Sequence, residues 1–215
     1  MHIGQAAHAF SDLFSLPLSR VQSTCRYLRE AGFVRSGARG VNAPHLADIE
    51  VVRILIALMA TESPGDAVER CKYFASLPVE PSRCRMSAEQ AETFKGRTAE
   101  DILSALLKGM REGSIKRQSE GKTAKELKAA DFAALGGASL ELNVSLGIID
   151  LMEEPNGYGL HFTNDLSVYE LTIDNIVEPP FWSRMSRITR INHTTLMDVA
   201  NLAATDSSTK ESDTT

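Results

Sequence analysis

The chain has 215 residues, of which 43% are hydrophobic, and this is enough apolar material for the core of one large domain or two small ones. Its three cysteines are widely spaced and form no CxxC pair, which argues against a disulfide framework or a zinc site. No apolar run is as long as a membrane span, and the start lacks the basic and apolar regions of a secretory signal. We therefore expect a cytoplasmic protein without a membrane partner, although its net charge of −5 by itself disfavours a nucleic-acid binder.

The first thirty residues predict two helices joined by a tight turn. Apolar residues recur at helical spacing over residues 3–14, and Pro17 prevents that helix from continuing. A second helix is expected over residues 18–33, with Ser19 as its N-cap. Gly32 should end it, because glycine reaches the left-handed conformation that a helix C-terminus needs. A turn of this length between two helices is typical of a helix-turn-helix.

A glycine-rich basic segment over residues 35–45 follows the second helix and predicts a hairpin, or wing. The third helix, over residues 47–61, is apolar almost all round, so it should be buried on more than one side. We expect it to be the spine of the N-terminal domain.

Residues 17–45 hold five arginines against one acid, Glu30. Each cation can meet a backbone phosphate and release counterions, and the second helix carries residue types that read base edges in a major groove. The residues predicted to face bases are Arg20, Gln22, Ser23 and Arg26. The residues predicted to hold phosphate or the minor groove are Arg29, Arg35, Arg39 and Asn42. The DNA-binding set also includes Ser19 and His45, and for His45 a structural role is the alternative.

The charge is unevenly distributed along the chain. From residue 130 to the end there are thirteen acids against four basic residues, a net of −9. Because the whole chain carries −5, residues 1–129 carry +4. This asymmetry indicates a basic binding half and an acidic half with another task. The alternative for the basic helix is an ordinary amphipathic helix with a solvated face.

Residues 62–112 predict a helical extension. Ser63 and Pro64 open a fourth helix, which runs to about residue 77. The segments 87–90 and 98–101 each match the capping box that begins a helix. Residues 113–137 are polar and basic, and predict a linker or an arm that adds phosphate contacts.

The pattern changes to strands at residue 138. Alternating apolar residues over 140–151 predict one strand, and Asn156-Gly157 predicts a hairpin turn into a second strand over residues 158–163. Two more strands are expected over 167–173 and 184–192. A closing helix is expected over 194–204, before a disordered tail. The fold class expected is α+β, with these parts: 1–61 a winged helix-turn-helix DNA-binding domain, 62–112 a helical extension, 113–137 a basic linker, 138–204 an antiparallel β-rich domain that assembles subunits or binds a protein partner, and 205–215 the tail.

Motifs that carry catalysis or nucleotide binding are missing from the sequence. GxxxxGK[ST], GxGxxG, GxSxG and HExxH do not occur. The five histidines have no paired carboxylates at metal-ligand spacing. We therefore expect a protein that is not an enzyme and that binds neither a metal nor a cofactor.

Four segments in residues 3–61 carry a family resemblance: IGQAAHAF, LSRVQSTCRYLREAGFV, a glycine-arginine wing and ADIEVVRILIALMA. They resemble the winged helix-turn-helix of the MerR class and of phage excisionases and small terminase subunits. CRYLREAGFV stands where the MerR class has a similar RYY-REGL segment. The chain departs from the pattern in a longer turn that contains Pro17, in the wing SGARGVNAPH, and in having no long coiled-coil helix. The whole chain also resembles uncharacterised proteins encoded in phages and prophages of alphaproteobacteria.

The resemblance implies double-stranded DNA as the partner and a phage-type transcriptional regulator as the function. A small winged domain rarely reaches specific affinity alone, so a symmetric dimer or a larger ring is expected. Two alternatives stay open: a small-terminase-like DNA-packaging subunit that forms a ring of many copies, and a non-enzymatic protein-interaction module.

Overall fold

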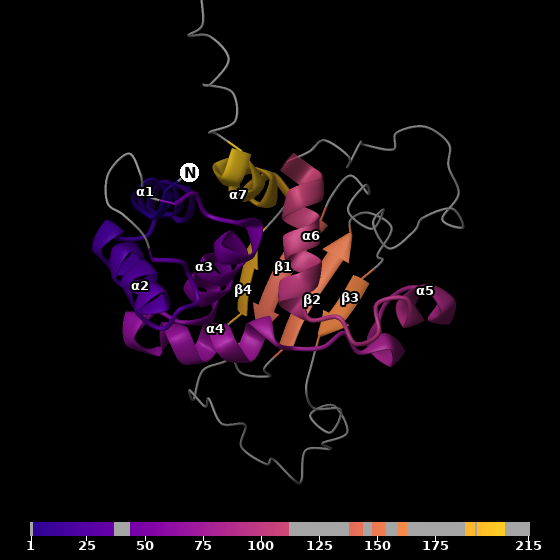
Figure 1. Cartoon of the computed structure of the whole chain (residues 1–215). Coiled ribbons are helices and arrows are strands. Elements are labelled where there is room, and N and C mark those ends of the chain that lie inside the picture. The colour runs from indigo at the N-terminus through magenta and orange to yellow at the C-terminus, as the bar shows by residue number, and fades with distance from the viewer. Residues whose placement is uncertain are drawn as a thin grey trace, which may run out of the picture.

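The structure is a computed structural model, and it describes residues 2–36, 44–111, 138–143, 148–153, 159–162, 188–191 and 193–204. Within these ranges the chain is mostly helical and contains one four-stranded antiparallel sheet (Figure 1). The helices are α1 (Ile3–Phe14), α2 (Leu18–Glu30), α3 (Asp48–Ala60), η2 (Pro64–Asp66), α4 (Ala67–Ala75), η3 (Pro81–Arg83), α5 (Ala88–Glu92), α6 (Ala99–Arg111) and α7 (His193–Ala204). The strands are β1 (Ala138–Asn143), β2 (Ile148–Glu153), β3 (Gly159–Phe162) and β4 (Ile188–Ile191).

The turn between α1 and α2 is closed by local hydrogen bonds. Ser15 adopts a left-handed conformation with φ of 51°, which ends α1. The Leu16 N–H then donates to the Ser11 carbonyl at 3.0 Å, and the Ser11 hydroxyl donates to the Leu16 carbonyl at 2.7 Å. Pro17 occupies the N-cap position of α2, so the expectation that Ser19 caps this helix is wrong. Since Pro17 presets its own φ and lacks an N–H, the helix begins directly after it.

The end of α2 is confirmed at Gly32. This residue has φ of +79°, its N–H donates to the Arg29 carbonyl at 3.1 Å, and the Phe33 N–H donates to the Leu28 carbonyl at 2.9 Å. These two bonds form a Schellman motif, which needs a left-handed residue after the helix and therefore favours glycine.

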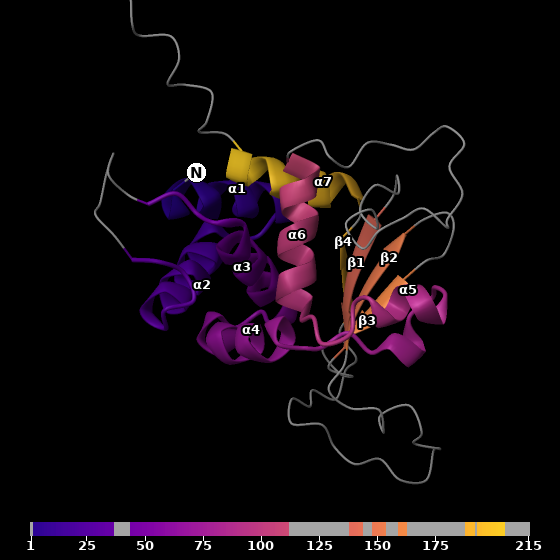
Figure 2. The ribbon, with the colours of Figure 1, turned by 45° about the vertical axis from the view of Figure 1, so that its right-hand side comes forward.

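Helix α3 is the centre of the fold, as its apolar composition predicts. Ten of its residues, Glu50 among them, are buried, and it contacts α2, α4, α6 and α7. Two arginine–carboxylate pairs join it to α6. Arg53 donates to both carboxylate oxygens of Glu100, at 2.6 and 3.0 Å, and Arg111 of α6 makes a two-pronged pair with Asp48. Figure 2 shows α6 beside α3, and α3 itself also contacts β1.

The capping predictions for the helical extension are confirmed. Thr98 accepts the N–H of Asp101 at 3.2 Å, and the Asp101 carboxylate accepts the Thr98 N–H at 3.1 Å. Ser87 and Gln90 make the same reciprocal pair before the short helix α5. Such pairs satisfy the N–H groups that have no partner inside the helix.

The sheet has the strand order β3-β2-β1-β4, and all neighbouring strands are antiparallel. The single long strand expected over residues 140–151 is wrong, because β1 and β2 are separate and pair with each other, Leu140 opposite Leu151. The pairing of β2 with β3 agrees with the hairpin predicted around Asn156-Gly157, and β4 lies within the predicted strand 184–192. The strand expected over residues 167–173, the linker 113–137 and the tail 205–215 lie outside the described residues.

The expectation of a self-contained β-rich domain is not supported. Alternate residues of the strands, including Leu140, Ile149 and Phe162, are buried in one hydrophobic cluster with side chains of α3, α6 and α7. The sheet buries these apolar residues against helices, so it depends on the helical layer for its core. None of the helices in the described ranges is both long and apolar enough to cross a bilayer.

Candidate nucleic-acid interface

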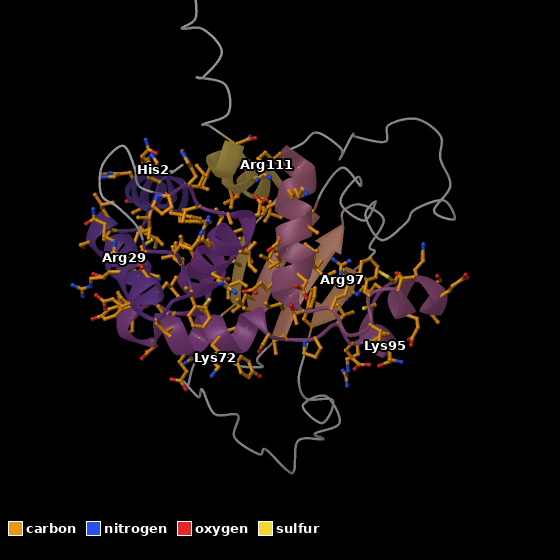
Figure 3. The ribbon with its side chains drawn as sticks, viewed as in Figure 1. His2, Arg29, Lys72, Lys95, Arg97 and Arg111 are labelled. Atoms are coloured by element: carbon orange, nitrogen blue, oxygen red, sulfur yellow. The ribbon has the colours of Figure 1, made fainter. Side chains whose placement is uncertain are left out.

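Four of the predicted DNA-binding residues form a stripe on the exposed face of α2. Ser19, Gln22, Arg26 and Arg29 are all exposed, and their spacing of three or four residues places them on one side of the helix. The opposite side buries Val21, Thr24, Cys25 and Leu28 in the core. Helix α2 lies at the outer edge of the molecule, away from the sheet, and Arg29 projects from its outer side (Figures 1 and 3). We call these four residues the α2 stripe.

Arg26 has two neighbours on its own helix. Its guanidinium carbon lies 5.0 Å from the centroid of the Tyr27 ring, and its Nε lies 3.9 Å from a Glu30 carboxylate oxygen. The side chains of Arg26 and Glu30 are both more than half exposed, so water and salt screen this ion pair and it contributes little stability. Arg26 can therefore exchange Glu30 for another acceptor.

Arg29 is a less constrained cation. Within the described parts of the chain, no carboxylate lies within ion-pair distance of its guanidinium. Beneath it, burial raises the pKa of the Cys25 thiol to about 12, so Cys25 contributes no negative charge to this face. Ser23, the other predicted residue of this helix, is half-buried.

Arg20, predicted to face bases, is instead hydrogen-bonded to the C-terminal end of α3. Its Nη2 donates to the Thr61 carbonyl at 2.8 Å and approaches the Leu58 carbonyl at 3.4 Å. These carbonyls lie at the C-terminal end of α3, where a helix has unsatisfied acceptors and a partial negative charge that favours cations. The sequence contained a signal for this contact, because no glycine follows Ala60 to close α3 by itself.

Arg35 is paired with a buried carboxylate that the sequence reasoning missed. Its Nε and Nη2 donate to Glu50 at 3.0 and 2.9 Å, its backbone N–H donates to the same carboxylate at 2.6 Å, and its Nη2 also donates to the His45 carbonyl at 2.7 Å. The Ala47 N–H is a further donor to Glu50, at 2.7 Å. Glu50 therefore ties together the residues on either side of segment 36–46. The clue in the sequence to this role of Glu50 is its place in the first turn of α3, three residues after Ala47.

The electrostatics of this pair follow from its geometry. Burial alone would raise the pKa of the Glu50 carboxyl, but the hydrogen bonds from the Arg35 side chain and from the backbone N–H groups of Ala47 and Arg35 outweigh it, and the pKa lies below its usual value. The hydrogen bonds from its side chain to Glu50, and the negative charge of that carboxylate, raise the pKa of Arg35. Both groups are therefore charged at neutral pH.

His45 lies beside the start of α1. Its backbone pairs with that of His2, and the two imidazole centroids are 4.4 Å apart. Across the described ranges, no cluster of three or more histidine, cysteine, aspartate or glutamate side chains is placed to hold a metal ion. Arg39 and Asn42 lie outside the described residues. In the fold, the α2 stripe thus lies on one surface, Arg35 lies beside His45, and Arg20 is bonded to the end of α3.

No protein-family model, curated protein or solved structure matches this chain.

Proposed function

We propose that this protein binds double-stranded DNA through the α2 stripe and acts as a phage-type transcriptional regulator. The observation that supports the proposal is the exposed face of α2, the second of two helices joined by a tight turn. Gln22, Arg26 and Arg29 are exposed there, and Arg29 projects at the edge of the molecule (Figure 3). A helix in this position is the element that enters a major groove in helix-turn-helix proteins. Binding, not catalysis, is the activity proposed.

The chemistry of the stripe divides between bases and phosphates. The Arg26 guanidinium can donate two hydrogen bonds to a guanine, and the Gln22 amide can pair in the same two-pronged way with an adenine. Arg29 is suited to a phosphate, because charge and reach are enough for that contact. Ser19 can add a hydroxyl donor to the backbone.

Acidic residues near the first half of α2 repel DNA and so favour DNA contact at the C-terminal half of this helix. Helix η2 packs against α2, and Arg20 joins the first half of α2 to Thr61. Glu62 and Asp66, both exposed, therefore lie near that first half. A polyanion is repelled there, so we expect DNA to approach over Arg26 and Arg29.

The first experiment is a salt titration of DNA binding with the full chain and a fluorescent mixed-sequence duplex of about 30 base pairs, long enough for several phosphate contacts. The affinity should fall steeply with salt, and Arg29→Ala should reduce the slope of log affinity against log salt by about 0.9, the value for one phosphate contact. The matched control is Lys95→Ala, because Lys95 lies on the opposite side of the molecule from Arg29 (Figure 3). An affinity that is insensitive to salt would refute the proposal.

Sequence readout needs a separate test, in which duplexes are selected from a randomised pool with the wild-type protein. On a selected duplex, Arg26→Ala and Gln22→Ala should each cost about 1–3 kcal/mol, while binding to a mixed-sequence duplex changes less. Equal losses on both duplexes would assign these residues to the DNA backbone instead.

The regulator is further proposed to act as a symmetric dimer, since two copies read two half-sites. The mass in solution tests this proposal. A dimer supports it, and a ring of many copies would support a DNA-packaging subunit instead.

A further inference from the structure

Arg35 directs all of its hydrogen bonds to one side of the guanidinium. Nε donates to Glu50, and Nη2 donates both to Glu50 and to the His45 carbonyl. Within the described ranges, Nη1 donates no hydrogen bond, although the side chain is 60% exposed. The inner edge of the guanidinium is therefore saturated, and its outer edge faces away from its protein partners with two N–H groups available.

Glu50 holds this arrangement firmly. Its side chain is only 4% exposed, and its two oxygens accept four N–H donors, three from Arg35 and one from Ala47. The anion is thus inside and the cation outside, so an approaching polyanion meets the arginine first. A side chain already fixed in one rotamer loses little entropy when it binds, unlike a free surface arginine.

We propose that Arg35 is a phosphate-binding residue, whose outer Nη1 edge contacts the backbone of duplex DNA, and that Glu50 is the positioning residue that fixes this edge. The inference rests on the proposed DNA binding and adds a second contact point to the α2 stripe. Arg35 is separated from the end of α2 by only four residues, 31–34, which keeps it within about 18 Å of that end, a distance that one duplex can span. The contact is to phosphate, because the two remaining N–H groups, both on Nη1, are charged donors that phosphate oxygens can accept.

Glu50→Gln gives the sharpest test, because positioning predicts weaker DNA binding and simple electrostatics predicts tighter DNA binding. Removing a negative charge should by itself tighten DNA binding. If Glu50 positions Arg35, however, the glutamine amide loses one acceptor, the guanidinium is released, and binding weakens. Arg35→Ala should reduce the salt slope by about 0.9, which corresponds to roughly eightfold weaker binding at 0.1 M salt. The probe is the same mixed-sequence duplex, since a phosphate contact is independent of sequence.

A double-mutant cycle separates positioning from a general structural effect. Glu50→Gln should weaken binding in the wild-type background but cause no further loss in the Arg35→Ala background, because the loss acts through Arg35. The control pair is Glu50→Gln with Arg29→Ala, whose effects should add. An unchanged or tighter affinity of Glu50→Gln, or equal losses in both Arg35 backgrounds, would overturn the proposal.

Arg35→Lys keeps the charge and leaves Glu50 in place, so it tests the proposal even if Glu50→Gln fails to fold. A lysine ammonium can pair with Glu50 or contact a phosphate. It lacks the planar guanidinium that lets arginine do both at once. It should therefore bind DNA as weakly as Arg35→Ala, and wild-type affinity would refute the inference. If the wild-type protein binds no DNA, the proposed function itself fails. If it binds and Arg35→Ala binds equally well, only this inference fails.

Discussion

Arg53 provides a direct test of how α3 and α6 are joined. Its Nε and Nη2 bind both oxygens of Glu100, its Nη1 donates to the Phe33 carbonyl at 3.0 Å, and its guanidinium carbon lies 5.4 Å from the centroid of the Phe33 ring. The side chains of Arg53 and Glu100 are 24% and 17% exposed, so both charges are mostly removed from water. Arg53→Ala would leave a largely buried carboxylate and a backbone carbonyl without their donor.

The magnitude follows from that loss. Removing one partner of a buried ion pair costs roughly 3–5 kcal/mol, and the residual exposure of this pair favours the lower end, about 3 kcal/mol. For a chain of this length, such a loss lowers the melting temperature by roughly 6–12 °C. Thermal unfolding followed by circular dichroism measures the shift, and urea unfolding gives the free energy.

The double variant Arg53→Met, Glu100→Leu distinguishes the cost of an unpaired charge from the net value of the pair. Replacing both partners with apolar side chains leaves no buried charge, so most of the stability should return. A double variant as unstable as Arg53→Ala would show that the arginine acts through packing or through Phe33. A shift below about 2 °C in Arg53→Ala would refute the reasoning altogether.

Three further predictions concern stability and thiol chemistry. Phe74 is fully buried, so Phe74→Ala should cost about 3–5 kcal/mol in urea unfolding, and a loss below about 1 kcal/mol would contradict its place in the core. The pKa of Glu50 is lowered in the folded state, so its stabilisation is present above its ordinary value of 4.5 and is lost as the pH falls through the lower folded value. Unfolding midpoints between about pH 3 and 7 should therefore depend less on pH in Glu50→Gln than in the wild type. Finally, burial raises the pKa of the Cys25 and Cys71 thiols to about 12, whereas Cys84 is partly exposed. A thiol reagent at about pH 8 should therefore modify Cys84 first in the folded protein. Rapid reaction of all three cysteines would refute the burial of Cys25 and Cys71.

Features that depend on a few neighbouring residues could be predicted from the sequence. The bounds of α1, the end of α2 at Gly32 and the reciprocal cap of Thr98 and Asp101 all agree with expectation. Each arises from contacts within about one helical turn, where side-chain spacing and backbone preference decide the conformation. The exposed α2 stripe follows from the same helical period, since Val21, Cys25 and Leu28 recur on the opposite face, which the core buries.

Only the tertiary structure decided which arginines remain available. Arg20 and Arg35 look like the other cations in the sequence, but their partners lie far along the chain: Thr61 is 41 residues from Arg20, and Glu50 is 15 residues from Arg35. Packing likewise decided that the strands share a core with α3, α6 and α7, since alternation predicts a buried face but not what covers it. Sequence periodicity determines which face of an element is apolar, whereas the partner of a long charged side chain depends on which helix end or carboxylate the fold brings within its reach.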